Sequence, residues 1–321
     1  MRVLVTGGAG YIGSIVATRL LESGDAVTVL DDLSTGHRDA VPAGVPFVLG
    51  RVHDAKDLLS GECFDAVVHL AASSLVAESI ANPAKYEENN VVGTRRLVAA
   101  LAGLGAERLV FSSSAAVYGE PDEVPITEDA PTRPVNPYGA SKLAVDELLA
   151  EQASHGVLGA VSLRYFNVAG AYAGLGERHD PESHLVPIAL EAALGLRPGL
   201  VIYGEDYATR DGTCVRDYIH VADLAAAHLA ALERAVAGRH RVYNLGNGTG
   251  FTVREVLSAV ETVTGRSLAV TVGARRAGDP AVLVASSARA ASELGWVPER
   301  PEVATMIEDA WQVLLARRGG R

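Results

Sequence analysis

A tyrosine and a lysine four residues apart form the pair of side chains best suited to chemistry in this sequence. Tyr138 and Lys142 follow Asn136 and Pro137, residue types that favour the N-cap and the first position of a helix. This spacing places both side chains on one helical face. A phenol has a pKa of about 10, and a neighbouring ammonium and the positive end of a helix both favour the phenolate. The pattern therefore predicts a lowered Tyr138 pKa and a general base; a pair exposed on a surface helix is the alternative.

Three hydroxyls stand upstream of this helix. Ser112, Ser113 and Ser114 end an apolar run in the segment FSSSAAVYG. If the run is a strand of a parallel sheet, its carboxyl end lies at the edge where open α/β folds bind ligands. A hydroxyl there can share a substrate proton with a tyrosine base. Three small residues that merely end a strand are the alternative.

A glycine-rich turn opens the chain. Gly7, Gly10 and Gly13 occur three residues apart in VTGGAGYIGS, where an apolar run gives way to a helical pattern. Such a turn lets backbone amides approach a pyrophosphate at the positive end of a helix. Asp31 follows Gly13 by 18 residues and can accept hydrogen bonds from a ribose 2′-hydroxyl. Asp31 and Asp32 together favour NAD over NADP, and a merely tight strand–helix turn is the alternative.

Elements that can position these residues recur along the first half of the chain. Apolar, β-branched runs typical of strands buried on both faces occupy 2–7, 26–31, 46–50, 64–71, 107–114 and 160–166. Helical patterns between them include 11–23, 84–104 and 137–155. This alternation predicts an α/β fold with a Rossmann-type, doubly wound parallel sheet.

The alternation ends after about residue 168. Later helices are expected over 185–195, 221–237, 252–264 and 301–317. The second half therefore predicts a smaller, mixed α/β substrate-binding lobe. We expect an NAD-binding lobe over residues 1–168 and a substrate lobe over most of 169–321, with some segments returning to the first lobe.

Composition narrows the classes of function. The 321 residues include 28 Lys and Arg and 39 Asp and Glu, for a net charge of −11. Without a basic run, this charge disfavours nucleic acids and anionic membranes as partners. Cys63 and Cys214 have no partner spacing, and the nine histidines lack metal-ligand spacing, so no metal is expected. Neither a signal peptide nor an apolar stretch of about 18 residues occurs, so a cytoplasmic location is expected.

Several motifs in a fixed order identify a family. The chain resembles the extended short-chain dehydrogenase/reductase family from Val3 to about Asp279, through the glycine turn and the segments DDLSTG, VVHLAASS, NNVVGT, SSSAAVYG, YGASK, LRYFNVAGA and VRDYIHVADLA. The resemblance implies NAD as cofactor. It also implies that Tyr138 is the catalytic base, that Lys142 lowers its pKa, and that Ser114 helps to move the substrate proton.

The resemblance also assigns the remaining site residues. Positions implied to bind NAD are Gly7, Gly10, Tyr11, Ile12, Gly13, Asp31, Asp32, Val52, Leu70, Ala71, Ala72, Asn89, Ser112, Tyr138, Lys142 and Tyr165. Positions implied to bind a UDP-sugar are Ser114, Tyr138, Asn167, His184, Leu185, Val201, Tyr203, Arg216, Arg276 and Asp279. Two positions depart from the family pattern near the cofactor: Arg51 stands where an aspartate is common, and Ser74 where a lysine is.

Within the family, the chain is most similar to enzymes that interconvert UDP-glucose and UDP-galactose. The implied reaction is oxidation at C4, a 4-keto intermediate, and hydride return to the opposite face, so that NAD is not consumed. The resemblance further implies a homodimer through a four-helix contact of the 84–104 and 137–155 helices.

Other functions on this scaffold remain open. They are epimerisation of UDP-N-acetylglucosamine or UDP-glucuronate, decarboxylation of UDP-glucuronate, and, from a different class, NAD sensing without catalysis. The resemblance implies that Leu283 stands where side-chain size decides whether an N-acetyl group fits. A 4,6-dehydratase is disfavoured because elimination needs a carboxylate pair where this chain has Ala115 and Ala116.

Overall fold

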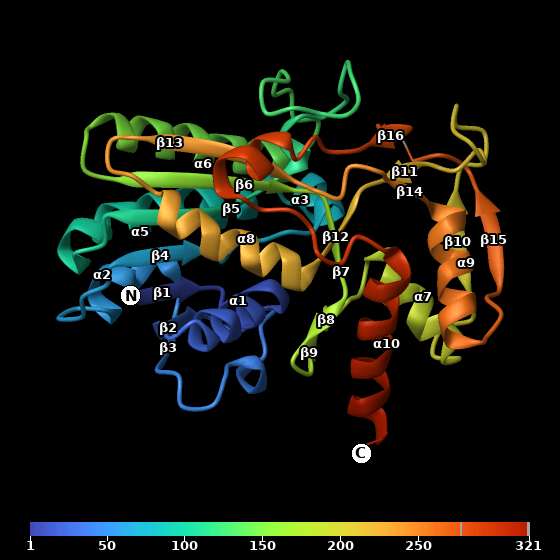
Figure 1. Ribbon diagram of the computed structural model, residues 1–321, viewed down its shortest axis with the longest axis horizontal. Coiled ribbons are helices and arrows are strands. Elements are labelled where there is room, and N and C mark those ends of the chain that lie inside the picture. Colours follow the sequence, from blue (N-terminus) through green and yellow to red (C-terminus); the bar gives the residue numbers. More distant parts are fainter. Residues whose placement is uncertain (277, 320–321) are drawn as a thin grey trace.

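A seven-stranded parallel sheet forms the larger lobe of the structure, a computed structural model that describes residues 1–276 and 278–319 (Figure 1). Its strand order is β13-β6-β5-β4-β1-β2-β3. The chain runs outward from β1 to β3 and then crosses to β4 on the other side of β1, so the order reverses between β1 and β4. Ligands of open α/β sheets bind at such a reversal, beyond the carboxyl ends of the strands. The strands are β1 (Arg2–Thr6), β2 (Ala26–Asp31), β3 (Phe47–Leu49), β4 (Ala66–His69), β5 (Arg108–Ser114), β6 (Gly159–Tyr165) and β13 (His240–Leu245).

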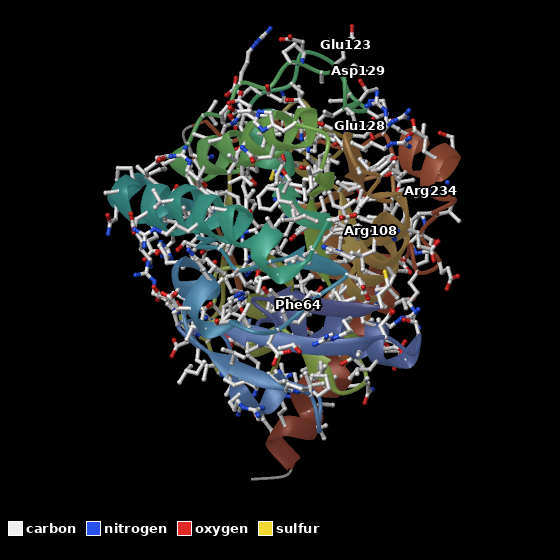
Figure 2. The ribbon with its side chains drawn as sticks, turned by 90° about the vertical axis from the view of Figure 1, so that its left-hand side faces the viewer. Phe64, Arg108, Glu123, Glu128, Asp129 and Arg234 are labelled. Atoms are coloured by element: carbon white, nitrogen blue, oxygen red, sulfur yellow. The ribbon has the colours of Figure 1, made fainter. Side chains whose placement is uncertain are left out.

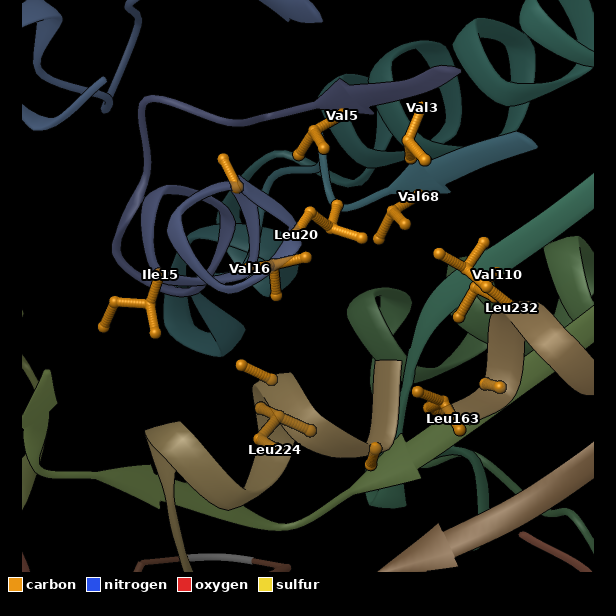
Figure 3. Packing of buried hydrophobic residues seen from close by; sticks show 14 of the residues in the cluster. Val3, Val5, Ile15, Val16, Leu20, Val68, Val110, Leu163, Leu224 and Leu232 are labelled. Carbon is orange, nitrogen blue, oxygen red and sulfur yellow. The ribbon is translucent and has the colours of Figure 1, made fainter. Parts of the chain in front are cut away.

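Helices cover both faces of this sheet. On one face, α1 (Tyr11–Glu22) and α8 (Val221–Arg234) pack against the strands, and Leu20 and Leu224 lie within the apolar cluster drawn in Figure 3. On the other face, a second apolar cluster joins the strands to α2 (Ala55–Leu58), α5 (Gly93–Leu101) and α6 (Pro137–Ser154). The predicted doubly wound α/β fold is confirmed.

The six expected strands are present, but two details differ. Burial on both faces is wrong for β3, which pairs only with β2 among the described strands and leaves Leu49 61% exposed. An edge strand lacks a second neighbour, and this explains the exposure. The seventh strand, β13, was not predicted; it pairs with β6 from Ala160 opposite His240 to Tyr165 opposite Leu245.

The expected helix over 84–104 is interrupted. It comprises α4 (Pro83–Tyr86), a π-helical stretch η3 (Glu87–Val92), α5 and a final 3₁₀ turn η4 (Ala102–Leu104). Single π-helical turns often occur at functional sites because they redirect side chains that a regular helix would place elsewhere. This turn contains Asn89 and Asn90, whose contacts are described below.

The second lobe has its own apolar core. This core joins α7 (Leu185–Ala193), α9 (Val253–Thr264) and α10 (Val303–Gly319), and the helices begin within two residues of their expected positions. Short strands complete it: β10 (Leu200–Tyr203) with β15 (Val270–Gly273), β11 (Val215–Arg216) with β14 (Phe251–Thr252) and β16 (Val282–Leu283), β7 (Asn167–Ala169) with β12 (Tyr218–His220), and β8 (Ala171–Tyr172) with β9 (Leu175–Gly176). Although α8 and β13 lie beyond residue 168, they pack on the large sheet; the division at residue 168 stays a prediction.

The amino ends of the central strands face away from the second lobe. Arg108 begins β5 and Phe64 precedes β4, and both lie on the side of the molecule that faces the viewer in Figure 2. The carboxyl ends therefore point toward the second lobe. In the part of the chain that the structure describes, none of the helices is both long enough and apolar enough to cross a membrane.

The glycine turn predicts a large cost for one added methyl group. A Cβ on Gly13 would lie 2.0 Å from the Gly7 carbonyl oxygen, whereas a Cβ on Gly103 would meet nothing within 4 Å. Because the obstructing atom is backbone, Gly13→Ala should lower the free energy of unfolding by about 3 kcal/mol. Urea denaturation measures this, with Gly103→Ala as the matched control. Equal stability of the two variants would contradict the close packing of the turn.

Candidate active site

One cleft collects the residues that the sequence singled out. It has a volume of about 1140 Å³ and lies where the carboxyl ends of the strands face the second lobe. Every residue proposed above for catalysis, NAD binding or UDP-sugar binding lines it, as do both departures from the family pattern, Arg51 and Ser74. Leu283 is not among its lining residues; this side chain packs against the apolar cluster of Val117, Tyr118 and Ile126.

The glycine turn forms one wall of the cleft. Gly7 has φ of +74°. A Cβ there would lie 2.6 Å from the amide nitrogen of Ala71, which follows β4, the neighbour of β1 in the sheet. The Asp31 carboxylate holds the turn, because its oxygens accept hydrogen bonds from the amides of Ala9 (2.9 Å) and Leu33 (2.8 Å). Burial raises the pKa of Asp31, against the effect of these amides. The bare backbone, the start of α1 and the carboxylate together fit a dinucleotide.

The predicted helix start is present at α6. The Asn136 side chain accepts a hydrogen bond of 2.8 Å from the amide of Gly139, and Pro137 occupies the first turn. Lys142 is buried, and its Nζ donates to the carbonyl oxygen of Ser112 at 2.7 Å. This nitrogen lies 5.8 Å from the centroid of the Tyr138 ring. The helix therefore brings the phenol, the amine and the end of β5 into one place.

The expected lowering of the Tyr138 pKa is wrong for the protein without ligands. Burial raises the Tyr138 pKa, and the hydrogen bond from Ser114 opposes this only in part. Burial also lowers the pKa of Lys142 to about 8, opposed by the nearby carboxylate of Asp146. A low-dielectric surrounding disfavours the charged form of each group, and this desolvation outweighs the attraction that the spacing suggested.

Asn90 is a buried residue that supports the cleft wall and that sequence reasoning missed. Its amide nitrogen donates to Ser141 Oγ (2.9 Å) and to the Ser73 carbonyl oxygen (3.0 Å), and its Oδ1 accepts from the Ser73 amide (2.8 Å). The side chain is 2% exposed. It therefore ties the residue before Lys142 to the loop after β4. The double asparagine of NNVVGT was the available signal, but it pointed only to Asn89.

Arg51 takes part in the same wall. It donates to Asn89 Oδ1 at 2.9 Å, and Asn89 Nδ2 donates to Ser73 Oγ at 3.1 Å. The departure from the family pattern at this position is therefore accommodated by a hydrogen bond to the Asn89 side chain.

Two tyrosines that line the cleft are held by hydrogen bonds. Tyr11 donates to the carbonyl oxygen of Gly170 at 2.6 Å, and Tyr165 hydrogen-bonds Ser112 Oγ.

The second lobe supplies the opposite wall. Arg216 forms an ion pair with Asp279, and the guanidinium of Arg276 lies 4.0 Å from the centroid of the Tyr203 ring. Both arginines line the cleft. Burial lowers the His184 pKa, but hydrogen bonds to Glu177 and Glu182 outweigh it and raise this pKa to about 10. The two guanidinium groups suit an anionic nucleotide, whereas any charge on His184 is offset by the Glu177 and Glu182 carboxylates.

The fold and the site define a class of protein: a Rossmann-fold enzyme with a serine–tyrosine–lysine centre and a second lobe for a nucleotide. Comparison with known proteins narrows the class. The chain belongs to the NAD dependent epimerase/dehydratase family, whose model matches residues 3–246. The resemblance drawn from the motifs is confirmed.

Relatives of known name are similar over nearly their whole length. A UDP-glucose 4-epimerase of Streptomyces lividans is 55% identical over 316 residues, which cover 97% of this chain and 95% of the relative. Solved structures include UDP-glucose 4-epimerase from Brucella ovis in complex with NAD, with a TM-score of 0.93, 45% identity and 97% coverage of each chain. The enzyme from Bifidobacterium longum in complex with NAD+ and UDP has a TM-score of 0.93, 36% identity and 100% coverage of each chain.

Burial of the Lys142 amine predicts that replacing this amine increases the stability of the protein. Because burial lowers the Lys142 pKa from 10.5 to about 8, the amine costs folding free energy below pH 8. Lys142→Met should therefore raise the free energy of unfolding of the cofactor-free protein by about 3 kcal/mol at pH 7. Between pH 8 and 10.5 the unfolded chain binds more protons than the folded one, so the unaltered protein should gain stability relative to the variant.

Urea denaturation across this pH range measures both effects. Lys85→Met is the matched control, since Lys85 is an exposed partner of Glu78 and its loss should change stability by less than about 1 kcal/mol. A Lys142→Met protein less stable than the unaltered one at pH 7 would contradict the lowered pKa.

Proposed function

We propose that this protein interconverts UDP-glucose and UDP-galactose with bound NAD, by transient oxidation at C4 of the sugar. The observation that carries the proposal is the position of Tyr138, near Lys142 and together with Ser114, in a cleft shared by the glycine turn and the second lobe. Relatives named UDP-glucose 4-epimerase at 55% and 52% identity support the same reaction. NAD suits the cofactor wall because Asp31 disfavours a 2′-phosphate.

The reaction needs one group that moves a proton at the sugar. The Tyr138 phenolic oxygen takes the proton of the 4-hydroxyl, and the Ser114 hydroxyl shares that proton through its hydrogen bond. NAD, when bound, accepts the hydride from C4 and gives it back. The 4-keto sugar must turn about its phosphate linkage between the two transfers, so that the hydride returns to the opposite face. Tyr138 then returns the proton to the new 4-hydroxyl.

Two further sets of residues support these steps. The amides of the turn at Gly7, Gly10 and Gly13 would hold the cofactor pyrophosphate, and Lys142 would hold the nicotinamide ribose while staying fixed to the Ser112 carbonyl oxygen. Arg216 and Arg276 would hold the diphosphate of the substrate. Firm binding of UDP with a loosely held sugar permits the 4-keto sugar to rotate. The binding energy then comes from the nucleotide and not from the sugar.

Tyr138→Phe tests the assignment. The variant lacks the proton acceptor, so interconversion of UDP-galactose and UDP-glucose should fall at least about a hundredfold, the usual contribution of a general base. Bound NAD should be retained, because the glycine turn is unchanged. Product analysis measures the rate, and the absorbance of the purified protein measures the cofactor. Turnover near that of the unaltered protein would refute the role of Tyr138.

The same samples separate this function from NAD sensing without catalysis. Unaltered protein given a UDP-sugar should develop the absorbance of NADH as the 4-keto state accumulates, and Tyr138→Phe should not. A panel of UDP-hexoses, UDP-N-acetylhexoses and UDP-glucuronate, with product identification, then defines the substrate. Conversion of UDP-glucuronate alone would replace the proposed reaction with another on the same scaffold.

We also propose that two copies associate through α5 and α6. Leu97, Leu101 and Leu149 are not available for this contact, since they are buried within the monomer. The outer faces instead carry small and charged residues of opposite sign. These are Arg95, Arg96 and Ala99 on α5, and Glu147, Ala150 and Glu151 on α6, all exposed. A two-fold axis can oppose the basic face of one copy to the acidic face of the other, which supports a four-helix contact.

Ala150→Arg tests this association. A large side chain at a close helix contact should convert a dimer to a monomer of 33.5 kDa, as measured by light scattering after gel filtration. The matched control is Ala304→Arg, at an exposed alanine of α10. If both variants keep the mass of the unaltered protein, the contact lies elsewhere.

A further inference from the structure

We propose that Glu177, His179, Glu182 and His184 form a binding site for one divalent transition-metal ion, with Zn²⁺ as the ion best matched by the ligand chemistry. These residues lie in the segment between β9 and α7, and Glu177, His179 and His184 line the cleft. No metal was expected from sequence, because the histidine spacing lacks a metal-ligand pattern. The fold supplies the missing ligands by folding Glu177 back onto the histidines.

The four ligand atoms lie close together. His184 Nδ1 lies 2.8 Å from Glu177 Oε1 and 2.9 Å from Glu182 Oε1, and His179 Nδ1 lies 2.9 Å from Glu177 Oε1. One ligand atom from each of the four residues falls within 4.8 Å of all the others. The two imidazole rings are 5.0 Å apart between centroids. Four donors from four side chains are the number that a tetrahedral ion requires.

Burial and charge favour an ion over solvent. The side chains of Glu177 and Glu182 are only 8% and 4% exposed, although each carries a carboxylate. The Glu182 carboxylate is also oriented, since its Oε1 accepts hydrogen bonds from the amides of Ser183 (2.8 Å) and His184 (2.9 Å). Two buried carboxylates balance the charge of one divalent cation. Such outer contacts fix a ligand before the metal arrives.

The donor set selects the ion. Two imidazole nitrogens with two carboxylate oxygens suit Zn²⁺ better than Ca²⁺ or Mg²⁺, which prefer oxygen ligands in larger number. Zn²⁺ bonds of about 2.0–2.1 Å place tetrahedral ligand atoms about 3.4 Å apart. The present contacts of 2.8 to 2.9 Å would therefore open by roughly half an ångström on binding. Any pair near the 4.8 Å limit would have to close by more than about 1 Å.

The position of the site gives the ion a structural role. Between the ligands, the Arg178 carbonyl oxygen contacts His37 Nε2 (2.9 Å), and the Arg178 guanidinium forms two hydrogen bonds to Asp39 (2.8 and 2.9 Å). The segment is thus attached to the sheet lobe at one end and continues into α7, where Leu185 lines the cleft. An ion at the four ligands would hold this segment closed on itself across the cleft rim.

Metal binding to tag-free protein tests the proposal. After removal of metals with a chelator, titration calorimetry with ZnCl₂ should give one site per chain, and elemental analysis after dialysis should find one Zn²⁺ retained. The double variant His179→Gln, His184→Gln should retain no Zn²⁺ and bind at least about a hundredfold more weakly. His155→Gln, which removes an exposed histidine far from the cluster in sequence, is the matched control and should bind as the unaltered protein does.

A second measurement keeps the test independent of folding defects in the variants. Co²⁺ added to the unaltered protein should give the visible absorption of a tetrahedral ion, and one equivalent of Zn²⁺ should abolish it. Glu177→Gln alone should weaken Zn²⁺ binding at least tenfold while its circular dichroism stays unchanged. The proposal is overturned if the unaltered protein retains no Zn²⁺, or if the double variant retains as much as the His155→Gln control. Neither outcome depends on cofactor content or on turnover.

Discussion

Burial of the Lys142 amine at the carboxyl end of β5 is the constraint on which the rest of the site depends. Its Nζ is fixed on the Ser112 carbonyl oxygen, one turn of α6 after Tyr138 and one turn before Asp146. Asp146 in turn pairs with Arg164 at 2.9 Å, with both side chains less than 10% exposed. Charged groups are costly to bury unless they are compensated, so this row of three fixes α6 against β5 and β6. The phenol is positioned by the same row.

The electrostatics of the site reverse a simple local argument. Spacing along α6 correctly places an amine beside a phenol. This lowers the Tyr138 pKa only if the attraction between the two charges exceeds the cost of removing them from water. In the structure both groups are buried, and burial raises the Tyr138 pKa and lowers the Lys142 pKa, so that each group favours its neutral form. A lower Tyr138 pKa would require additional positive charge beside the phenol.

How much the sequence predicts depends on whether the cause is local. Six of the seven strands of the large sheet, the Asn136 cap and the glycine turn follow from composition and short-range spacing, and all are present. The missed features have long-range causes. β13 is recognised as a strand of the large sheet only through pairing with β6, and the contacts of Asn90 depend on a π-helical turn. The cluster at Glu177 and His184 depends on how one irregular segment folds back, which no periodicity records.

The place of β13 in the large sheet also bears on how the molecule is made. Its strand completes the outer edge next to β6, yet the chain reaches it only after β7 to β12 and α8 have been synthesised. Until then β6 presents an open row of backbone donors and acceptors, the kind of surface that recruits other strands. A nascent polypeptide that stops near residue 168 would therefore be prone to self-association. The large sheet is thus completed only by a strand from beyond residue 168.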